Sequence, residues 1–313
     1  MKERIKKFIE DIISEQNYER LHRTTITPIR GALKDLRWRL QSFFFTARRR
    51  FSSKMAIHVY AVCYNEEVIL PYFLRHYSAI AERITIFDNM STDRSVSIIK
   101  KCPIAKIIPY DSGGELRNDI LGQIRNNAWK KSRGLADWVV VVDADEFLWH
   151  KNLIAYLKAC KKNNVTIPVP EGFGMVSDSP PSSDGMIFDE IRSGIFDPLF
   201  CKFSVFNPNL IREMNYQPGC HRADPAGKVV FDRNKGLKLL HYRFLGLDYV
   251  LKRHSAYRER VSEYNKKRGL SFHYTRDPGY VAEGFIKKKS EARELGFLIK
   301  GDQEISGSGN TRI

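Results

Sequence analysis

The stretch that decides the fold reads Trp138-Val-Val-Val-Val-Asp-Ala-Asp-Glu146. Its apolar first part, residues 138–142, is typical of a strand that is buried on both faces, as in a parallel sheet covered by helices. The carboxylates Asp143 and Asp145 follow at once, separated by one small residue. Clustered negative charges cost free energy unless a cation compensates them, and carboxylate oxygens suit Mg²⁺ or Mn²⁺. We therefore expect a divalent metal site at the end of this strand, and the alternative is a solvated acidic loop.

Upstream of this stretch, the chain alternates between strand-like and helix-like patterns. Strands are expected over residues 57–63, 83–87, 105–108 and 138–142, and helices over residues 67–81, 93–101 and 115–132. Repeated strand–helix–strand units predict a mostly parallel, doubly wound sheet with right-handed crossovers. The expected fold class is therefore α/β, with a mostly parallel sheet flanked by helices.

Two of the earlier strands also end in polar clusters. The first is followed by Tyr64-Asn-Glu-Glu67 and the second by Asp88-Asn-Met-Ser-Thr-Asp93. Ligands of doubly wound sheets collect beyond the carboxyl ends of the strands. The sequence thus predicts one ligand site that is built from both clusters and from residues 143–146.

The positive charge of the chain is unevenly distributed. Over 313 residues, 52 Lys and Arg against 36 Asp and Glu give a net charge of +16, and residues 1–54 hold 14 basic against six acidic residues, a net of +8. Apolar residues recur at helical spacing in this segment, which favours either binding to an anionic membrane surface or packing as a helical extension on the main domain. We expect a basic amphipathic extension over 1–54, an α/β domain over 55–275, and a C-terminal helix with a disordered tail over 276–313.

Composition also indicates the cellular location of the protein. No stretch approaches the roughly 18 consecutive apolar residues of a spanning helix, and the N-terminus lacks the apolar core of a secretory signal. Five scattered cysteines without a C-x-x-C pair suggest neither a disulfide framework nor a zinc cluster. We expect a cytoplasmic protein, peripheral at the inner face of the membrane if the basic extension binds lipid.

Six blocks of the chain together resemble nucleotide-sugar glycosyltransferases of the GT-A fold, in particular the family 2-like bacterial group related to family 92. Three of them follow expected strands, namely Val62-Cys-Tyr-Asn-Glu-Glu67, Phe87-Asp-Asn-Met-Ser-Thr-Asp93 and Asp143-Ala-Asp-Glu-Phe147. The later blocks are Glu171-Gly-Phe-Gly-Met-Val-Ser-Asp178, Pro218-Gly-Cys-His221 and Leu239-Leu-His-Tyr-Arg-Phe-Leu-Gly246. The resemblance implies a GT-A-like, Rossmann-like domain.

The same resemblance implies transfer of a sugar, with inversion, from a nucleotide-diphosphate donor to a glycan or lipid-linked glycan acceptor in bacterial surface-polysaccharide synthesis. It places Glu66 and Asp88 in the nucleoside site, beside Asn65, and makes Asp143 and Asp145 hold the donor through ribose and metal. The ion, Mn²⁺ or Mg²⁺, would stabilise the charge of the departing diphosphate as a Lewis acid.

The resemblance leaves the roles of several residues open. His241 completes the metal site and favours Mn²⁺, or it is a hydrogen-bonded structural side chain, and His221 is the competing ligand. Arg125 approaches the diphosphate or is an ordinary exposed helix arginine.

Inversion requires a general base that accepts the proton of the acceptor hydroxyl. The sequence offers Asp178 first and Glu190 second, with Asp189 as a further candidate. Spacing singles out none of the three, and each is otherwise a surface carboxylate or a helix cap.

Other protein classes fit less well. A nucleotidyltransferase needs a glycine-rich loop after its first strand, where this chain has Tyr64-Asn-Glu-Glu67. A metal-dependent phosphatase using the D-x-D is disfavoured because that motif usually opens the domain, whereas about three strands precede it here. A basic nucleic-acid-binding protein is suggested by the charge and by aromatic residues near arginines, but residues 55–270 contain no motif of that class.

Overall fold

The computed structural model describes Leu36, Trp38 and residues 55–232 and 236–298. Apart from Leu36, Trp38 and residues 133–135, these residues belong to one compact unit. The extension predicted over 1–54 lies outside the described residues apart from those two positions, and so does the tail predicted after residue 300. The predicted domain boundaries stay predictions.

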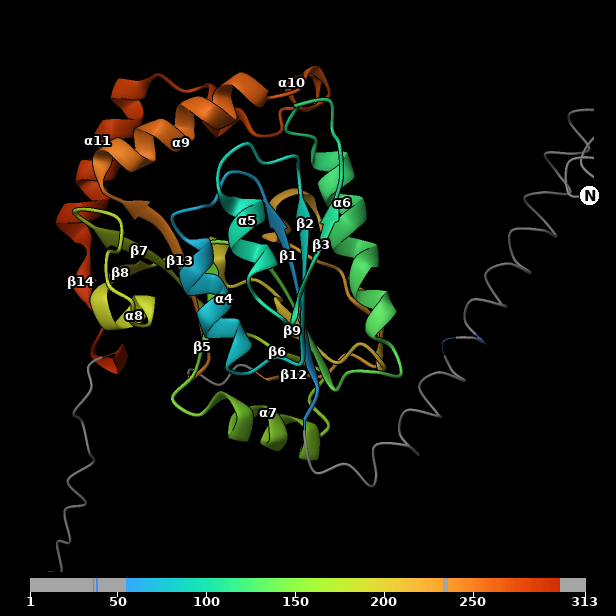
Figure 1. Ribbon diagram of the computed structural model, residues 1–313. Helices are drawn as coiled ribbons and strands as arrows, with labels where there is room; N and C mark the ends of the chain where they lie inside the picture. The colour runs from blue at the N-terminus through green and yellow to red at the C-terminus, as the bar shows by residue number, and fades with distance from the viewer. Residues whose placement is uncertain (1–35, 37, 39–54, 233–235, 299–313) are drawn as a thin grey trace, which may run out of the picture. The chain divides into compact units, whose positions relative to one another are not determined.

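The first half of the unit forms a five-stranded sheet with the order β3-β2-β1-β4-β9 (Figure 1). Its strands are β1 (Ile57–Cys63), β2 (Arg83–Asp88), β3 (Ala105–Pro109), β4 (Trp138–Asp143) and β9 (Val205–Phe206). The pairs β3–β2, β2–β1 and β1–β4 are parallel, and only the edge strand β9 is antiparallel in this sheet. The predicted α/β class with a mostly parallel sheet is confirmed.

The strand register brings the polar ends of the central strands to one edge of this sheet. Cys63 pairs with Asp88, and Val62 pairs with Asp143. The residues that follow β1, β2 and β4 therefore emerge side by side, as the sequence predicts. Residues 138–142 of β4 are all buried, which explains why this strand is apolar on both faces.

Helices cover both faces of the sheet. The first helices are α4 (Leu70–Ser78), α5 (Ser95–Lys100), α6 (Asn118–Asn127) and the 3₁₀ segment η2 (Ala128–Ser132). Residues of α4 and α5 pack with Val59 and Ile84 on one face, whereas Trp129 of η2 packs with Val139 on the other. The helix predicted over 115–132 is thus shorter, beginning at Asn118 and continuing after Asn127 as η2.

The second half adds a sheet that the sequence does not predict. Its order is β14-β8-β7-β13-β5, with β5 (Glu146–Trp149), β7 (Glu171–Ser177), β8 (Ser193–Phe196), β13 (Lys238–Leu245) and β14 (Arg293–Glu294). Because β5 begins at Glu146, the D-x-D turn joins the two sheets. Strand β13 runs antiparallel to β5 and pairs His241 with Glu146, so His241 lies beside this turn.

Shorter elements and three helices complete the unit. The strands are β6 (Ile167–Pro168), β10 (Ile211–Glu213), β11 (Ala226–Gly227) and β12 (Phe231–Asp232), and the short helices are α7 (Leu153–Lys162), α8 (Ile187–Glu190), η3 (Pro198–Phe200), η4 (Pro218–Cys220), η5 (Phe272–Thr275) and η6 (Gly296–Leu298). Helices α9 (Leu247–Arg260), α10 (Glu263–Lys267) and α11 (Pro278–Glu291) lie together at the top of Figure 1. None of the described helices is long and apolar enough to cross a bilayer.

Candidate active site

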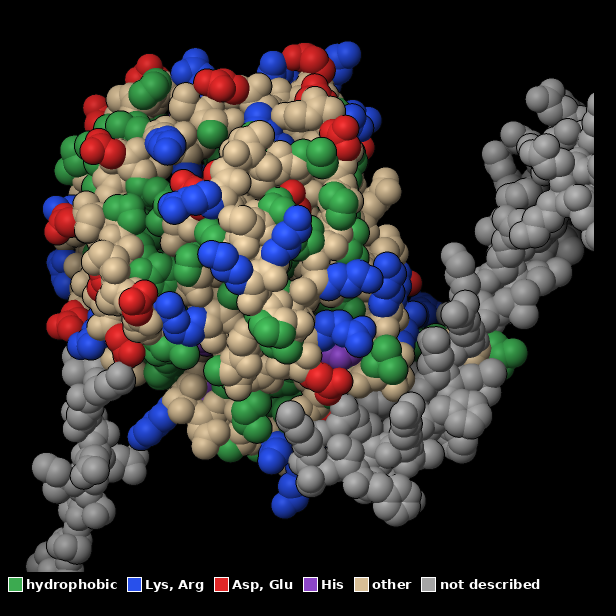
Figure 2. All heavy atoms as spheres, in the orientation of Figure 1, with side chains coloured by type: hydrophobic (Ala, Val, Ile, Leu, Met, Phe, Trp, Pro, Cys, Tyr) green, Lys and Arg blue, Asp and Glu red, His purple; other side chains and the backbone are tan. Residues whose placement is uncertain are grey.

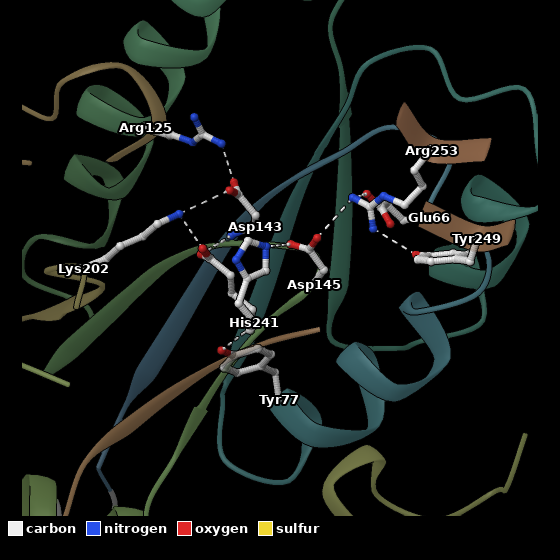
Figure 3. A network of polar contacts seen from close by, with 10 residues as sticks. Glu66, Tyr77, Arg125, Asp143, Asp145, Lys202, His241, Tyr249 and Arg253 are labelled. Atoms are coloured by element: carbon white, nitrogen blue, oxygen red, sulfur yellow. Dashed lines mark hydrogen bonds and ion pairs between the residues drawn. The ribbon is translucent and has the colours of Figure 1, made fainter. Parts of the chain in front are cut away.

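Buried charged side chains gather where β1 and β4 end and α9 crosses that edge. Figure 3 shows two basic side chains, Arg125 and Lys202, approaching Asp143, while Arg253 approaches Asp145 and Glu66. The sequence-predicted residues Glu66, Asp143, Asp145, Arg125 and His241 all belong to this network.

Asp145 is held by two basic side chains. His241 Nε2 lies 3.2 Å from Asp145 Oδ1, and Arg253 Nη2 lies 3.1 Å from Asp145 Oδ2. Burial raises the pKa of Asp145, but the charges of His241 and Arg253 outweigh it, so the net effect lowers the pKa of this carboxyl. Asp145 is therefore ionised at neutral pH.

Glu66 has the opposite balance. Arg253 Nη2 donates to Glu66 Oε1 at 2.8 Å, whereas Glu66 Oε2 is buried and has no hydrogen-bond partner. Burial, only partly opposed by the charge of Arg253, raises the pKa of Glu66 to about 8. At neutral pH the carboxyl thus carries a proton, and its unpartnered oxygen is available to a ligand hydroxyl or carbonyl group.

Asp143 is fully engaged within the protein. One of its oxygens pairs with Arg125 and the other lies 3.7 Å from Lys202 Nζ, while its backbone N–H donates to Glu146 Oε2 at 3.0 Å. Burial raises the pKa of Asp143, but the charges of Arg125 and Lys202 outweigh it and lower the pKa. Lys202 pairs with Glu146 as well, and both of these side chains are almost completely buried.

The cation that the acidic cluster needs is thus supplied largely by the protein. Three permanently basic side chains face four carboxyl groups, of which Glu66 is protonated at neutral pH. The basic side chains already balance the negative charge of the carboxylates. Charge compensation alone therefore does not require a metal ion here.

The geometry nevertheless fits a metal ion shared with a ligand. Asp145 Oδ1 and His241 Nε2 are 3.2 Å apart, a separation suited to two donor atoms that each lie about 2.1 Å from one ion. In the described part of the chain no group of three or more His, Cys, Asp or Glu side chains is arranged to hold a metal. Two protein ligands would leave the other positions to phosphate oxygens and water, as is usual for Mg²⁺.

Asp88 and Asn65 organise the loops at this edge. Asp88 accepts hydrogen bonds from the Ser91 backbone N–H at 3.1 Å and from the Ser91 hydroxyl at 2.6 Å. Asn65 adopts a left-handed backbone conformation with φ 52°, and its Oδ1 accepts from Thr92 N–H at 2.8 Å. The two polar clusters predicted to form a site therefore bind each other directly.

Tyr64 and Arg260 form a second unusual feature. The Arg260 guanidinium lies 3.2 Å from the centre of the Tyr64 ring, and its Nε donates to the Gly114 carbonyl at 2.9 Å. Its Nη1 and Nη2 are buried without a hydrogen-bond partner, and no described carboxylate lies within 4.0 Å. Burial lowers the pKa of Arg260. A buried cation without a counter-ion is costly, which points to a ligand that supplies acceptor oxygens.

The remaining sequence candidates lie elsewhere. Asp178 forms an ion pair with Lys289, and its side chain is 77% exposed. Glu190 accepts hydrogen bonds from the backbone N–H groups of Ser182 and Ser183. His221 Nδ1 bonds to the Leu199 carbonyl oxygen at 2.7 Å, and Asp189 lies beside Glu190 in α8. The ion pair of Asp178 and the hydrogen bonds of Glu190 and His221 described here do not involve Asp145 or Glu66.

Sequence reasoning missed Lys202, Arg253 and Arg260. Lys202 lies in an irregular segment, and nothing in its neighbourhood distinguishes it from a surface lysine. A signal did exist on α9, where Tyr249, Arg253 and Tyr257 are four residues apart and Arg260 follows three residues later. This spacing places all four on one face of the helix.

No protein family model and no curated protein matches the chain. Similar solved structures include S. aureus TarS, with 13% identity and a TM-score of 0.42 over 66% of this chain and 39% of that chain. A shorter TarS structure in complex with UDP has 12% identity and a TM-score of 0.41, covering 76% of this chain and 72% of that chain.

Glucosyl-3-phosphoglycerate synthase from Mycobacterium tuberculosis, in complex with Mn²⁺, UDP and glucosyl-3-phosphoglycerate, is a more distant match. It has 16% identity and a TM-score of 0.27 over 42% of this chain and 47% of that chain. The chain spans well under half the length of the first of these structures, 39%.

Proposed function

We propose that the protein is a nucleotide-sugar-dependent glycosyltransferase of GT-A type. The observation that carries the proposal is the buried group of Asp145, His241, Arg253 and Glu66 at the carboxyl edge of the parallel sheet. It joins two potential metal ligands, a fixed positive charge and an unpartnered carboxyl oxygen at the edge where such sheets bind nucleotides. The relation to family 92 remains a prediction from the motifs.

The diphosphate end of the donor is assigned to Asp145, His241 and Arg253. A nucleoside diphosphate leaves the sugar as a multiply charged anion, so positive charge near the scissile bond lowers the barrier. Asp145 and His241 would hold Mn²⁺ or Mg²⁺, which supplies Lewis-acid stabilisation of the departing diphosphate when bound. Arg253 adds a charge that is oriented in advance by Glu66 and Tyr249.

Charge balance suggests that metal and nucleotide bind together. The cluster already holds enough basic side chains to balance its ionised carboxylates, so an ion alone would add uncompensated positive charge. An ion that binds together with a diphosphate would not add uncompensated charge, because the diphosphate is negatively charged. We therefore expect the metal affinity of the free protein to be weak and to rise when a nucleoside diphosphate is present.

The nucleoside end is assigned to Glu66, Tyr64 and Arg260. Glu66 Oε2 has no partner and suits a ribose hydroxyl, and Arg260 offers two free nitrogen atoms to oxygen acceptors of the nucleotide. Arg260 follows Arg253 by seven residues on α9, about 10 Å along the helix axis. That separation supports the assignment of Arg260 to the end of the ligand remote from the diphosphate.

The proposal includes inversion, with a carboxylate as general base. Of the sequence candidates, Asp178 is preferred over Glu190. The Glu190 carboxylate is occupied by two backbone N–H groups, whereas Asp178 is exposed and engaged only in a surface ion pair with Lys289. Such a pair is easily broken.

The acceptor is proposed to be a glycan or a lipid-linked glycan, in bacterial surface-polysaccharide synthesis at the cytoplasmic side of the membrane. The basic extension over 1–54 would hold the enzyme near anionic lipid. A chain that begins at Ser53 should then lose co-sedimentation with anionic liposomes and keep donor hydrolysis. Equal liposome binding by the full-length chain and by the chain that begins at Ser53 would reject the membrane-binding role of the extension.

The central test is a screen of sugar release from uridine, guanosine, cytidine, thymidine and adenosine diphosphate sugars, with and without Mn²⁺ or Mg²⁺. We expect hydrolysis of at least one donor, loss of that activity in Asp145→Asn, and no loss in Asp248→Asn, an exposed carboxylate on α9. Failure of the wild-type protein to release sugar from any donor, or full activity of Asp145→Asn, would overturn the proposal.

A further inference from the structure

Arginine and aromatic side chains form a continuous series that leads from the candidate active site to the surface. It starts at Tyr257, which lies under the Arg253 guanidinium, with 5.7 Å between Arg253 Cζ and the ring centre. Tyr257 stacks on Tyr274 with ring centres 4.8 Å apart and an interplanar angle of 22°. Arg243 covers the Tyr274 ring at 5.5 Å.

The series continues outward from Tyr274. The His273 ring lies 4.1 Å from Tyr274 and 6.0 Å from Phe272. Arg276 then lies between two rings, 5.9 Å from Phe272 and 5.2 Å from Tyr280. We name this series the arginine–aromatic track, composed of Arg243, Tyr257, Phe272, Tyr274, Arg276 and Tyr280.

The outer end of the track is not part of a hydrophobic core. Phe272 is 59% exposed and Tyr280 is 61% exposed, although both are large aromatic residues. Isolated exposed apolar residues are common on protein surfaces. Here, in contrast, two exposed aromatic rings flank one arginine and connect to a buried charged site. Such an arrangement is typical of a binding surface.

The arginines of the track keep their charge available. Neither Arg243 nor Arg276 has a carboxylate within 4.0 Å in the described ranges, in contrast to Arg253, which has two. The surrounding segment, residues 252–280, contains eight basic and three acidic residues. On the face shown in Figure 2, acidic side chains lie mainly at the top and left, with basic side chains among them.

These properties suit a sugar chain that carries negative charge. Aromatic faces provide rigid apolar area for stacking, and guanidinium groups bind carboxylate or phosphate oxygens in a bidentate manner. A short distance separates the inner end of the track from the donor site, because Arg253 lies 5.7 Å from the centre of the Tyr257 ring and 3.1 Å from Asp145 Oδ2.

We propose that the arginine–aromatic track binds an anionic glycan, a chain bearing phosphate or carboxylate groups, and presents its end to the donor site. The inference deepens the proposed glycosyltransferase function and depends on it for the acceptor role. Binding of the anionic glycan itself does not depend on that function.

The test compares dextrans that share one backbone: neutral dextran, carboxymethyl dextran and phosphorylated dextran. Their affinities for the full chain and its variants are measured by fluorescence titration at one low salt concentration. We expect an anionic dextran to bind more tightly than the neutral one, and the carboxymethyl and phosphorylated forms to distinguish which anion is preferred.

Arg276→Gln should weaken binding of the preferred dextran about tenfold, as expected for loss of a hydrogen bond to a charged group. Phe272→Ala and Tyr280→Ala should weaken it less and affect neutral dextran too. Lys287→Gln is the matched control, since it removes the same charge from an exposed position of α11 outside the track. Its affinity should stay within twofold of the wild type.

Equal binding of neutral and anionic dextrans, or equal effects of Arg276→Gln and Lys287→Gln, would overturn the proposal. So would tighter, Arg276-dependent binding of a single-stranded oligonucleotide, which would assign the track to nucleic acid. Donor hydrolysis without acceptor separates the two ideas. Arg276→Gln should leave it unchanged, and its absence from the wild type would reject the enzyme function while the dextran measurements still decide the track.

Discussion

The charged cluster has two halves that differ in how completely their polar atoms are bonded. In the closed half, Asp143, Glu146, Arg125 and Lys202 pair with one another, and even the Asp143 N–H has a side-chain acceptor. In the open half, Asp145, Glu66, Arg253 and His241 also pair, but Glu66 Oε2 and His241 Nδ1 are buried without partners. Buried networks in which every polar atom is hydrogen-bonded rigidify a structure. Buried polar atoms without a hydrogen-bond partner indicate that something else, such as a ligand, supplies the partner.

The difference assigns different tasks to two aspartates of one motif. Asp143 and Asp145 are separated by a single residue, yet Asp143 binds the scaffold and Asp145 faces the open half. The predictions below test whether the closed half governs stability and the open half governs binding.

The largest effect is expected in the closed half. Lys202→Met would leave the buried Glu146 carboxylate near the partly exposed Asp143 carboxylate without their shared ammonium group. Removing one partner of a buried ion pair costs about 3–5 kcal/mol, so urea denaturation should show a loss of unfolding free energy of that order. Lys130→Met, which breaks the partly exposed pair with Glu213, should cost less than about 1 kcal/mol. Similar losses in both variants would contradict the distinction.

In the open half, His241→Ala should change metal use. If His241 is a ligand, its removal should raise the Mn²⁺ concentration needed for half-maximal donor hydrolysis by about 10–100-fold. His221→Ala should not move this concentration, because its imidazole bonds to the Leu199 carbonyl. The opposite pattern in the metal titration would transfer the ligand role to His221.

Arg260→Met separates stability from binding at one position. The change removes a buried cation without a counter-ion, so unfolding free energy should stay equal or rise, while nucleoside diphosphate affinity should fall about tenfold. Arg258→Met, two residues away at an exposed position of α9, should alter neither. A stability loss without a change in affinity would make Arg260 a structural residue.

The remaining prediction concerns the pH dependence of stability. The carboxyl of Glu66 has a pKa of about 8 when folded, above its ordinary value of 4.5. Below about pH 4.5 the group is protonated in both states, and between 4.5 and 8 only the folded state keeps the proton. Its contribution to unfolding free energy must therefore decline as pH rises through this window.

The measurement compares chemical denaturation at several pH values in the wild type and Glu66→Gln, which cannot ionise. The stability of the wild type should decrease relative to Glu66→Gln as pH rises from about 4.5 to about 8. Glu67→Gln, at the neighbouring and more exposed carboxylate, is the control: it keeps Glu66, so the stability of the wild type relative to Glu67→Gln should not decline in this window. Parallel profiles for wild type and Glu66→Gln would disprove the raised pKa.

The part of the structure with strong periodicity was predictable. Strands β1 to β4 lie where continuous apolar runs predict them, and the rule that ligands gather at strand carboxyl ends locates Glu66, Asp143 and Asp145. Their individual partners were not predictable, because Lys202 and Arg253 come from segments 56 and 108 residues beyond the carboxylates they bind.

The second sheet was missed partly because its strands β7 and β8 contain glycines, which are typical of loops. In β7, a Cβ atom at Gly172 would lie 2.2 Å from the backbone carbon of Phe200, so glycine is required by packing against η3 and not by a turn. Phe200 in turn packs on the His241 ring, with ring centres 4.5 Å apart. A local pattern cannot reveal such a tertiary constraint. The choice between Asp178 and Glu190 as general base has no local signal in the sequence either, and it stays a prediction.

The most direct test is calorimetry of a nucleoside diphosphate binding to Asp145→Asn and Asp143→Asn, each with and without Mn²⁺. We predict that Asp145→Asn loses the metal-dependent gain in affinity and also loses stability, because Arg253 and His241 then lack their ionised partner. Asp143→Asn should keep a metal-dependent gain and lose stability, because Arg125 loses its ionised partner and Lys202 keeps only Glu146. The reverse result, with metal dependence lost only in Asp143→Asn, would contradict the division of the motif into a scaffold half and a binding half.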